Sequence, residues 1–109
     1  MQKIIVSWSG GKDSALAYYR LQLDTQYEIA GLLTIVFKYD DGKYYIGMHM
    51  IDIELIKLQA KLIDVKLHII EYSDKESYNI KMLEFLTYCK SKSIVNIAFG
   101  DIHLRDLRT

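Results

Sequence analysis

Residues 3–21 read KIIVSWSGGKDSALAYYRL, and the expected fold is worked out from this stretch. The segment from Lys3 to Trp8 is β-branched and continuously apolar, which is typical of a strand buried on both faces. Apolar residues then return at helical spacing and predict a helix over 13–23. Its apolar face would carry Leu16, Tyr19 and Leu23. Two glycines, two serines, a lysine and an aspartate (Ser9–Ser14) therefore stand between a strand and a helix.

The rest of the chain alternates strands and helices. Further strands are predicted at 28–37, 65–72 and 93–100, and helices at 52–63 and 73–92. This order predicts an α/β fold with three α/β/α layers, in which helices cover both faces of a parallel sheet. Asp41-Gly42 between aromatic residues favours a small surface hairpin, and residues 101–109 look like the start of one more helix.

The two later helices carry recognisable signals. Asp52 can cap the first, whose wide apolar face suits packing on a sheet and combines Leu55, Leu58 and Leu62 with Ile56, Ala60 and Ile63. Ser73 and Glu76 match a capping box at the start of the second. One side of that helix is lined by Tyr78, Met82, Phe85 and Cys89.

Composition bounds the class of protein. The 109 residues suit one small domain, and a formal net charge of +0 gives no electrostatic footprint for nucleic acid or an anionic membrane. The longest apolar stretch, 29–37, is far shorter than the roughly 20 residues of a membrane span. Cys89 is the only cysteine, so no intrachain disulfide forms, which fits a reducing compartment. We expect a cytoplasmic protein.

The Ser9–Ser14 loop has the chemistry of a phosphate cradle. It follows a strand of the predicted parallel sheet, at the end where such sheets bind ligands, and the first turn of the next helix presents unpaired N–H groups. Gly10 and Gly11 let an anion approach the backbone, Ser9 and Ser14 add hydroxyl donors, and Lys12 adds positive charge. Asp13 either holds a magnesium ion or caps the helix.

Two better-known cradles are excluded. A Walker A loop needs a glycine five positions before Gly11, where this chain has Val6, and it needs Ser or Thr after Lys12, where this chain has Asp13. The dinucleotide fingerprint is absent because the two glycines are adjacent.

Ser9–Ser14 instead resembles the PP-loop, S-G-G-x-D-S, of the ATP pyrophosphatase superfamily, and fits it at every position. The resemblance implies an adenine-nucleotide alpha hydrolase-like (HUP, Rossmann-like) fold. In that superfamily the loop binds the β and γ phosphates of ATP, which leave as pyrophosphate while AMP is transferred to a carboxylate or carbonyl oxygen. A nucleophile then displaces AMP.

Three stretches are similar to the diphthine–ammonia ligase family: SWSGGKDSALAYYRL (7–21), MHMIDIELIKLQAKLIDVKLHII (48–70) and IAFGDIHLRDLR (97–108). The resemblance implies ATP and Mg²⁺ as cofactors, ammonia as the amine donor and a carboxylate acceptor. That acceptor is diphthine on an elongation factor in archaea and eukaryotes, and is unknown for bacterial relatives. The chain spans only the N-terminal half of the family's usual length, so we expect a truncated fold: one PP-loop ATP-binding domain, 1–109, without the substrate half.

The missing half has a structural consequence. The family's next strand is absent, so we expect the strand at 93–100 to expose its edge or to pair with another chain, and a homodimer is one way to cover it.

The resemblance assigns roles residue by residue. The leaving pyrophosphate is expected to be bound by Ser9, Gly10, Gly11 and Ser14. Lys12 is expected to pair with phosphate charge and Asp13 to hold magnesium. Leu33 and Thr34, placed at the end of the second strand, are expected to offer backbone groups to adenine. Gly100 and Asp101 follow the fourth strand, where Asp101 either orients the activated group or caps a helix.

The histidines and the cysteine are weaker candidates. His49 resembles a family position near the nucleotide, and a loop histidine without a role is the alternative. His68 is predicted in the core and His103 at the surface. Cys89 lies on an apolar helix face, which favours a buried thiol over a nucleophile.

The leading interpretation is an ATP-dependent amide ligase, with Lys12, Asp13 and Asp101 as its catalytic residues. One alternative is a nucleotide-binding module without catalysis. Another is a different PP-loop enzyme, such as a tRNA-modifying one, although such enzymes usually need a basic surface or paired cysteines.

Overall fold

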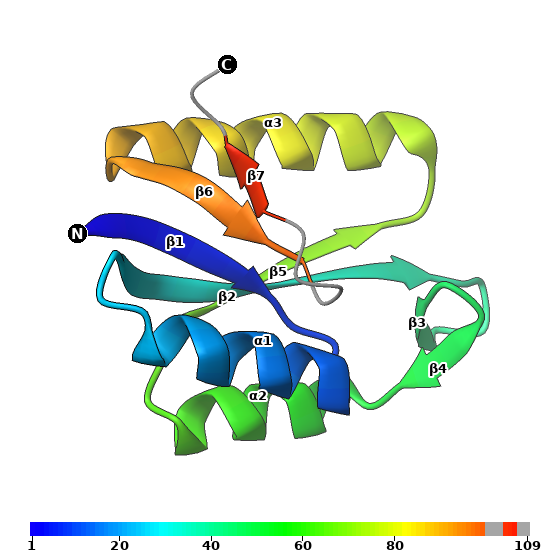
Figure 1. The fold of residues 1–109 in the computed structure, drawn as a ribbon. Coiled ribbons are helices and arrows are strands. Elements are labelled where there is room, and N and C mark those ends of the chain that lie inside the picture. Colours follow the sequence, from blue (N-terminus) through cyan, green and yellow to red (C-terminus); the bar gives the residue numbers. More distant parts are fainter. Residues whose placement is uncertain (100–103, 107–109) are drawn as a thin grey trace.

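The strand and helix expected on either side of the glycine loop are present in the computed structural model, which describes residues 1–99 and 104–106. They are β1 (Gln2–Ser7) and α1 (Lys12–Leu23). The other elements are β2 (Tyr27–Lys38), β3 (Tyr44–Ile46), β4 (His49–Ile51), α2 (Ile53–Leu62), β5 (Leu67–Tyr72), α3 (Lys75–Ser91), β6 (Ile94–Ala98) and β7 (Leu104–Asp106). Figure 1 shows their arrangement.

The strands form one sheet with a parallel centre. Within the described residues, β1 lies between β2 and β6, and β5 pairs with β2 from the other side, all in parallel. The short strands β3, β4 and β7 are antiparallel to their neighbours. The predicted parallel sheet is therefore confirmed at its centre, while the sheet as a whole is mixed.

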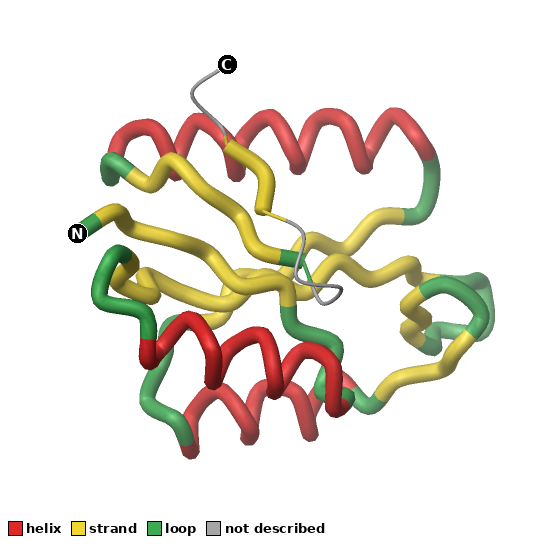
Figure 2. The backbone as a smooth tube through the Cα atoms, in the orientation of Figure 1, coloured by secondary structure: helices red, strands yellow, loops and turns green. Residues whose placement is uncertain are grey.

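Helices cover both faces, which confirms the three α/β/α layers (Figure 2). On one face, Phe85 and Cys89 of α3 pack with Ile5 and Leu33 of the sheet. On the other, Ile56 and Ala60 of α2 join Val6 and Leu32, together with partly buried residues of α1. These two cores hold the carboxyl end of β1 from above and below and so fix the position of the loop that follows it.

The prediction of which side of α1 is buried is wrong. The buried residues of this helix are Ser14 and Ala17, whereas Leu16, Tyr19 and Leu23 are on the solvent side. Small side chains let α1 lie close to the sheet, and the larger ones are left outside. The face predicted for α2 is right for Ile56 and Ala60 but wrong for the three leucines, which are half-exposed or more.

Helix caps were predicted with mixed success. Asp52 caps α2 as expected, since its carboxylate accepts hydrogen bonds from the backbone N–H groups of Glu54 and Leu55. The capping box of α3 exists, but one residue later than predicted: Asp74 is the N-cap and Ser77 the reciprocal partner. A box shifted by one residue satisfies the same two donors, because Asp and Ser are both good N-caps.

The end of the chain was predicted as a helix, and this is wrong for the part described there. Leu104–Asp106 forms β7, which pairs antiparallel with Asn96–Ala98 of β6. The edge of β6 that was expected to be exposed, or covered by another chain, is thus covered at these residues by the chain itself. Pairing with a free edge satisfies backbone groups that would otherwise need water.

The hairpin at Asp41-Gly42 is confirmed, with Phe37 and Lys38 of β2 opposite β3. Gly42 has φ +80, the left-handed conformation that such turns require. A second hairpin, β3–β4, was not predicted. In the described part of the chain, no helix is long and apolar enough to cross a membrane.

Candidate functional site

The loop between β1 and α1 leaves the first turn of the helix open. Gly10 has φ +83, a conformation that residues with a Cβ adopt only with strain. Gly11 is the N-cap of α1 and provides no side-chain cap. Within the described residues, no N-cap side chain therefore satisfies the N–H groups of the first helical turn, which follows the carboxyl end of β1 and where the helix dipole favours an anion.

Two serines brace this loop from inside. The backbone N–H of Ser9 donates to Oγ of Ser14 at 3.0 Å, and the two hydroxyl oxygens lie 2.8 Å apart. Ser14 is buried and Ser9 is exposed. The pair closes the loop across its base, so that Ser9 is the hydroxyl at the surface. Binding of phosphate by either serine remains a prediction.

Gln59 of α2 contacts both Trp8 and the Gly10 position, and the sequence analysis did not select it. Its Oε1 accepts a hydrogen bond of 2.9 Å from Nε1 of Trp8. A Cβ at Gly10 would lie 3.0 Å from the same oxygen. Gly10 is thus required by its positive φ, and a Cβ there would in addition make the Gln59 amide shift. A polar residue on the inward side of an otherwise leucine-rich helix was the only available hint.

The charged residues of the loop are at the surface. Lys12 and Asp13 are both exposed in the first turn of α1. Gly11 occupies the N-cap, so the alternative that Asp13 caps the helix is wrong. Asp13 is exposed in the first turn of α1, so its carboxylate is accessible to a magnesium ion that also binds phosphate oxygens, and this role remains a prediction. Across residues 1–99 and 104–106, no three His, Cys, Asp or Glu side chains gather as a metal site.

Leu33 and Thr34 were predicted at the end of their strand. They lie within it, because β2 continues to Lys38. They lie beside the end of β1, and both are buried. The Leu33 carbonyl accepts from the N–H of Trp8 at 2.8 Å, and the Thr34 hydroxyl donates to the Trp8 carbonyl at 2.7 Å. These bonds tie β2 to the start of the loop. A contact with adenine remains a prediction.

The remaining candidate site residues lie on a hairpin, outside the described residues, or in the packing around α3. His49 is exposed in β4, on a hairpin at the same end of the sheet as the start of α1 (Figure 1). Gly100, Asp101 and His103 lie outside the described residues. Cys89 is fully buried, as predicted, and burial raises the pKa of its thiol to about 11.

His68, predicted in the core, is half-buried and packs against Phe85 and Tyr88 on the α3 side of the sheet. Burial, assisted by the positive charge of Lys66, lowers the pKa of its imidazole. Both His68 and Cys89 therefore belong to the packing around α3 and not to the loop.

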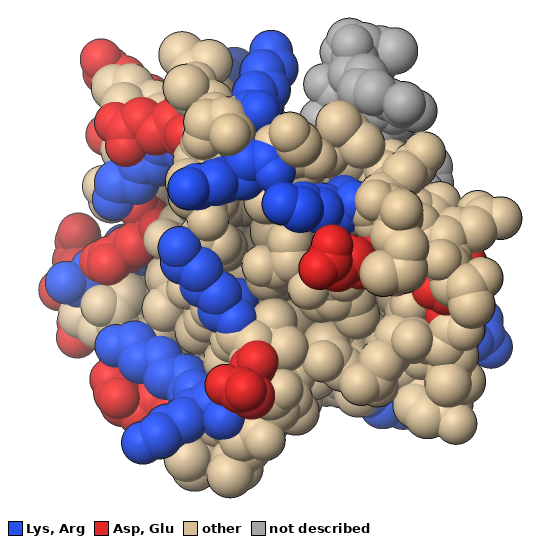
Figure 3. All heavy atoms as spheres, turned by 90° about the vertical axis from the view of Figure 1, so that its left-hand side faces the viewer, with Lys and Arg blue, Asp and Glu red and all other residues tan. Residues whose placement is uncertain are grey.

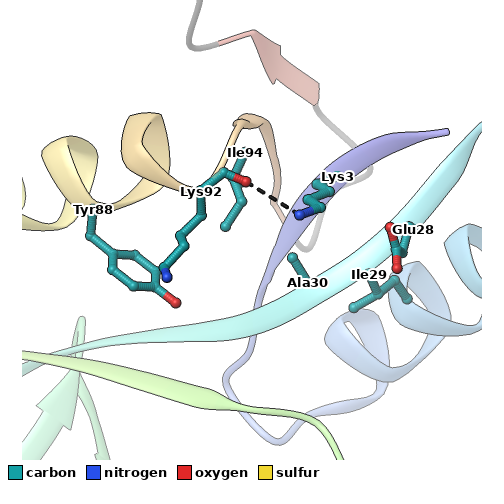
Figure 4. Close-up of a pocket in the computed structure, with 7 residues that line it drawn as sticks. All are labelled: Lys3, Glu28, Ile29, Ala30, Tyr88, Lys92 and Ile94. Carbon is teal, nitrogen blue, oxygen red and sulfur yellow. Dashed lines mark hydrogen bonds between the residues drawn. The ribbon is translucent and has the colours of Figure 1, made fainter.

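A cavity of about 340 Å³ lies at the opposite end of the sheet from the loop (Figure 4). Lys3 and Glu28 reach it from the amino ends of β1 and β2, and Tyr88 and Lys92 from the end of α3. Basic and acidic side chains alternate over this end of the molecule (Figure 3). The glycine loop, in contrast, is exposed from Ser9 to Asp13, so it is accessible to a large charged ligand.

The comparison with known protein families covers nearly the whole chain. A family model described as "Diphthamide synthase N-terminal domain" matches residues 2–109. The chain belongs to the diphthamide synthase N-terminal domain family. The predicted resemblance is thereby confirmed: this diphthamide synthase N-terminal domain is a PP-loop, nucleotide-binding α/β domain. No curated protein matches the chain.

Proposed function

We propose that this domain binds ATP–Mg²⁺ through Ser9–Ser14 and is the nucleotide-binding part of an ATP-dependent amide ligase. What supports the proposal most is the uncapped first turn of α1 behind Gly10 and Gly11. Several N–H donors and the ammonium group of Lys12 are available there for one anion. They must act together, because a helix terminus stabilises an exposed charge by only about 0.3–1 kcal/mol.

The reaction that suits this loop is adenylation followed by amide formation. A carboxylate oxygen attacks the α-phosphorus of ATP, the bond to the β-phosphate breaks, and pyrophosphate leaves with its negative charge against the N–H groups of the loop. Ammonia then attacks the acyl carbon, loses a proton and displaces AMP. The family name points to diphthine as the acceptor, whose amide is diphthamide.

Each residue of the loop has a task in this scheme. Gly10 and Gly11 admit the β and γ phosphates to the backbone, Ser9 adds a hydroxyl, and Ser14 holds Ser9 in place. Lys12 pairs with the charge that accumulates on pyrophosphate. Asp13 would hold Mg²⁺, which supplies further charge neutralisation when bound.

The test separates binding from catalysis. Titration calorimetry with ATP and Mg²⁺ should show binding that Lys12→Ala weakens and that Lys57→Ala, a change at an exposed lysine of α2, leaves alone. Exchange of labelled pyrophosphate into ATP should then depend on an acceptor bearing diphthine. Binding without exchange would favour a nucleotide-binding module, and absence of binding would refute the proposal.

A further inference from the structure

The outer sides of α1 and α2 carry large apolar side chains that neither core uses. On each helix they recur at the spacing i, i+3, i+7, which places them in one line along the helix. The exposed fractions are 45, 58 and 66 % for Leu16, Tyr19 and Leu23, and 50, 50 and 75 % for Leu55, Leu58 and Leu62. We call these six residues the outer stripes.

The two stripes lie on the same side of the molecule. Both helices pack on the same face of the sheet, through Ala17 of α1 and through Ile56 and Ala60 of α2. Trp8 lies between them, with its ring against the edge of Tyr18 and its Nε1 bonded to Gln59. Because the stripes lie opposite the buried sides of their helices, both face away from the sheet. The two helices lie along the lower side of the molecule in Figure 1.

This surface has the size of a protein interface. An aromatic side chain offers about 150–250 Å², and a leucine is near the lower end of that range, so the six stripe residues leave on the order of 500 Å² of apolar surface in water. Such a patch is at the upper limit for a monomer. It approaches the roughly 800 Å² that each partner buries in a stable complex.

The charges at the helix ends are complementary between two copies of this chain. Each helix has an acidic residue in its first turn, Asp13 or Glu54, and a basic residue in its last turn, Arg20 or Lys61. Both helices run antiparallel to the central strands, so the two acidic ends lie together and the two basic ends lie together. A second copy, turned by a twofold axis perpendicular to the helices, places acidic ends against basic ends.

We propose that the outer stripes are the interface of a homodimer, with α1 and α2 of the two copies antiparallel and Glu54 of each copy next to Lys61 of the other. Glu54 now pairs with Lys57 of its own helix at 3.3 Å, and both side chains are well exposed. Such a pair is weak and exchanges partners at little cost. The contact between Glu54 and Lys61 uses none of the residues assigned to ATP–Mg²⁺, so its tests do not depend on ATP binding.

The first test measures mass by sedimentation equilibrium over a range of concentrations. The wild-type chain of 12.7 kDa should sediment as a dimer, and Leu58→Glu as a monomer. The matched control is Leu83→Glu, at a leucine that is 67 % exposed on α3, the opposite face, and it should remain dimeric. Circular dichroism checks folding, and Leu62→Glu replaces Leu58→Glu if that variant does not fold.

The second test uses charge. Glu54→Lys and Lys61→Glu should each raise the dimer dissociation constant about fivefold, because the twofold axis repeats the contact. The two changes combined in one chain should restore the wild-type constant within about twofold. A wild-type monomer at every concentration, a dimer that survives Leu58→Glu and Leu62→Glu, or a double variant without rescue would each overturn the proposal. A monomer would assign the surface to a partner other than a second copy.

Discussion

Replacing Gly10 with alanine should separate strain in the loop from loss of the phosphate site. At φ +83, a residue with a Cβ costs about 1–2 kcal/mol of stability. The added Cβ would also lie 3.0 Å from Oε1 of Gln59, so the amide must shift and its hydrogen bond to Trp8 weakens. That bond contributes about 0.5–1.5 kcal/mol. We expect Gly10→Ala to lower the free energy of unfolding by about 2 kcal/mol.

Gly42→Ala is the matched control. Gly42 has φ +80, and no atom lies within 4 Å of the Cβ position, so this variant carries the same backbone strain far from the loop. Urea unfolding should show a loss of about 1–2 kcal/mol.

Affinity for ATP distinguishes the two variants. Displacing the backbone of the loop should weaken binding at least tenfold in Gly10→Ala, a loss of about 1.4 kcal/mol, and leave Gly42→Ala at the wild-type value in titration calorimetry. If Gly10→Ala binds ATP as tightly as wild type, or if both variants lose affinity equally, the loop does not hold the phosphates.

Three further predictions concern stability and reactivity. Ser14→Ala removes the acceptor of the Ser9 N–H and should lower the free energy of unfolding by about 1–3 kcal/mol in urea. Burial lowers the pKa of His68 in the folded chain, so the unfolded chain binds a proton at this imidazole more readily. The free energy of unfolding should therefore be highest above about pH 6.5 and should decrease as the pH falls below that value. This pH dependence should be lost in His68→Gln and kept in His49→Gln. Cys89 is fully buried with a thiol pKa of about 11, so a thiol reagent at neutral pH should react only at the rate of unfolding.

Each of these has a contrary outcome. A Ser14→Ala variant as stable as wild type would mean that water replaces the lost acceptor. An unchanged pH slope in His68→Gln would assign the slope to other groups. Rapid labelling of Cys89 in the folded chain would show that α3 opens locally.

The loop could be predicted from sequence because its chemistry is local. Few kinds of loop combine adjacent glycines, a lysine and two serines between an apolar strand and a helix. Gln59 could not be predicted, since it meets Gly10 and Trp8 only after α2 packs beside α1.

The orientation of α1 was mispredicted because two sides of this helix are compatible with burial. Periodicity favoured the larger residues, with Leu16 and Tyr19 among them. Packing against the sheet selected the smaller Ser14 and Ala17, which allow a closer approach. Volume at an interface between layers is a tertiary property that helical spacing does not encode.

The segment at 104–106 was mispredicted for a different reason. Its sequence has an acceptable helical pattern, and local propensity is a weak preference. The open edge of β6 offers backbone partners to Leu104–Asp106 that an isolated helical turn does not have. The sequence predicts that this edge is exposed or pairs with another chain, whereas Leu104–Asp106 of the same chain pairs with it.

The indole of Trp8 gives this domain a built-in optical probe. Trp8 is the single tryptophan of the chain, and it immediately precedes the glycine loop, 7 % exposed and bonded to Gln59. Its emission therefore comes from one known place, without contributions from other indoles. Any ligand that moves the loop or Gln59 should alter the colour or the quenching of that light, so that occupancy can be followed in stopped flow without attaching a label.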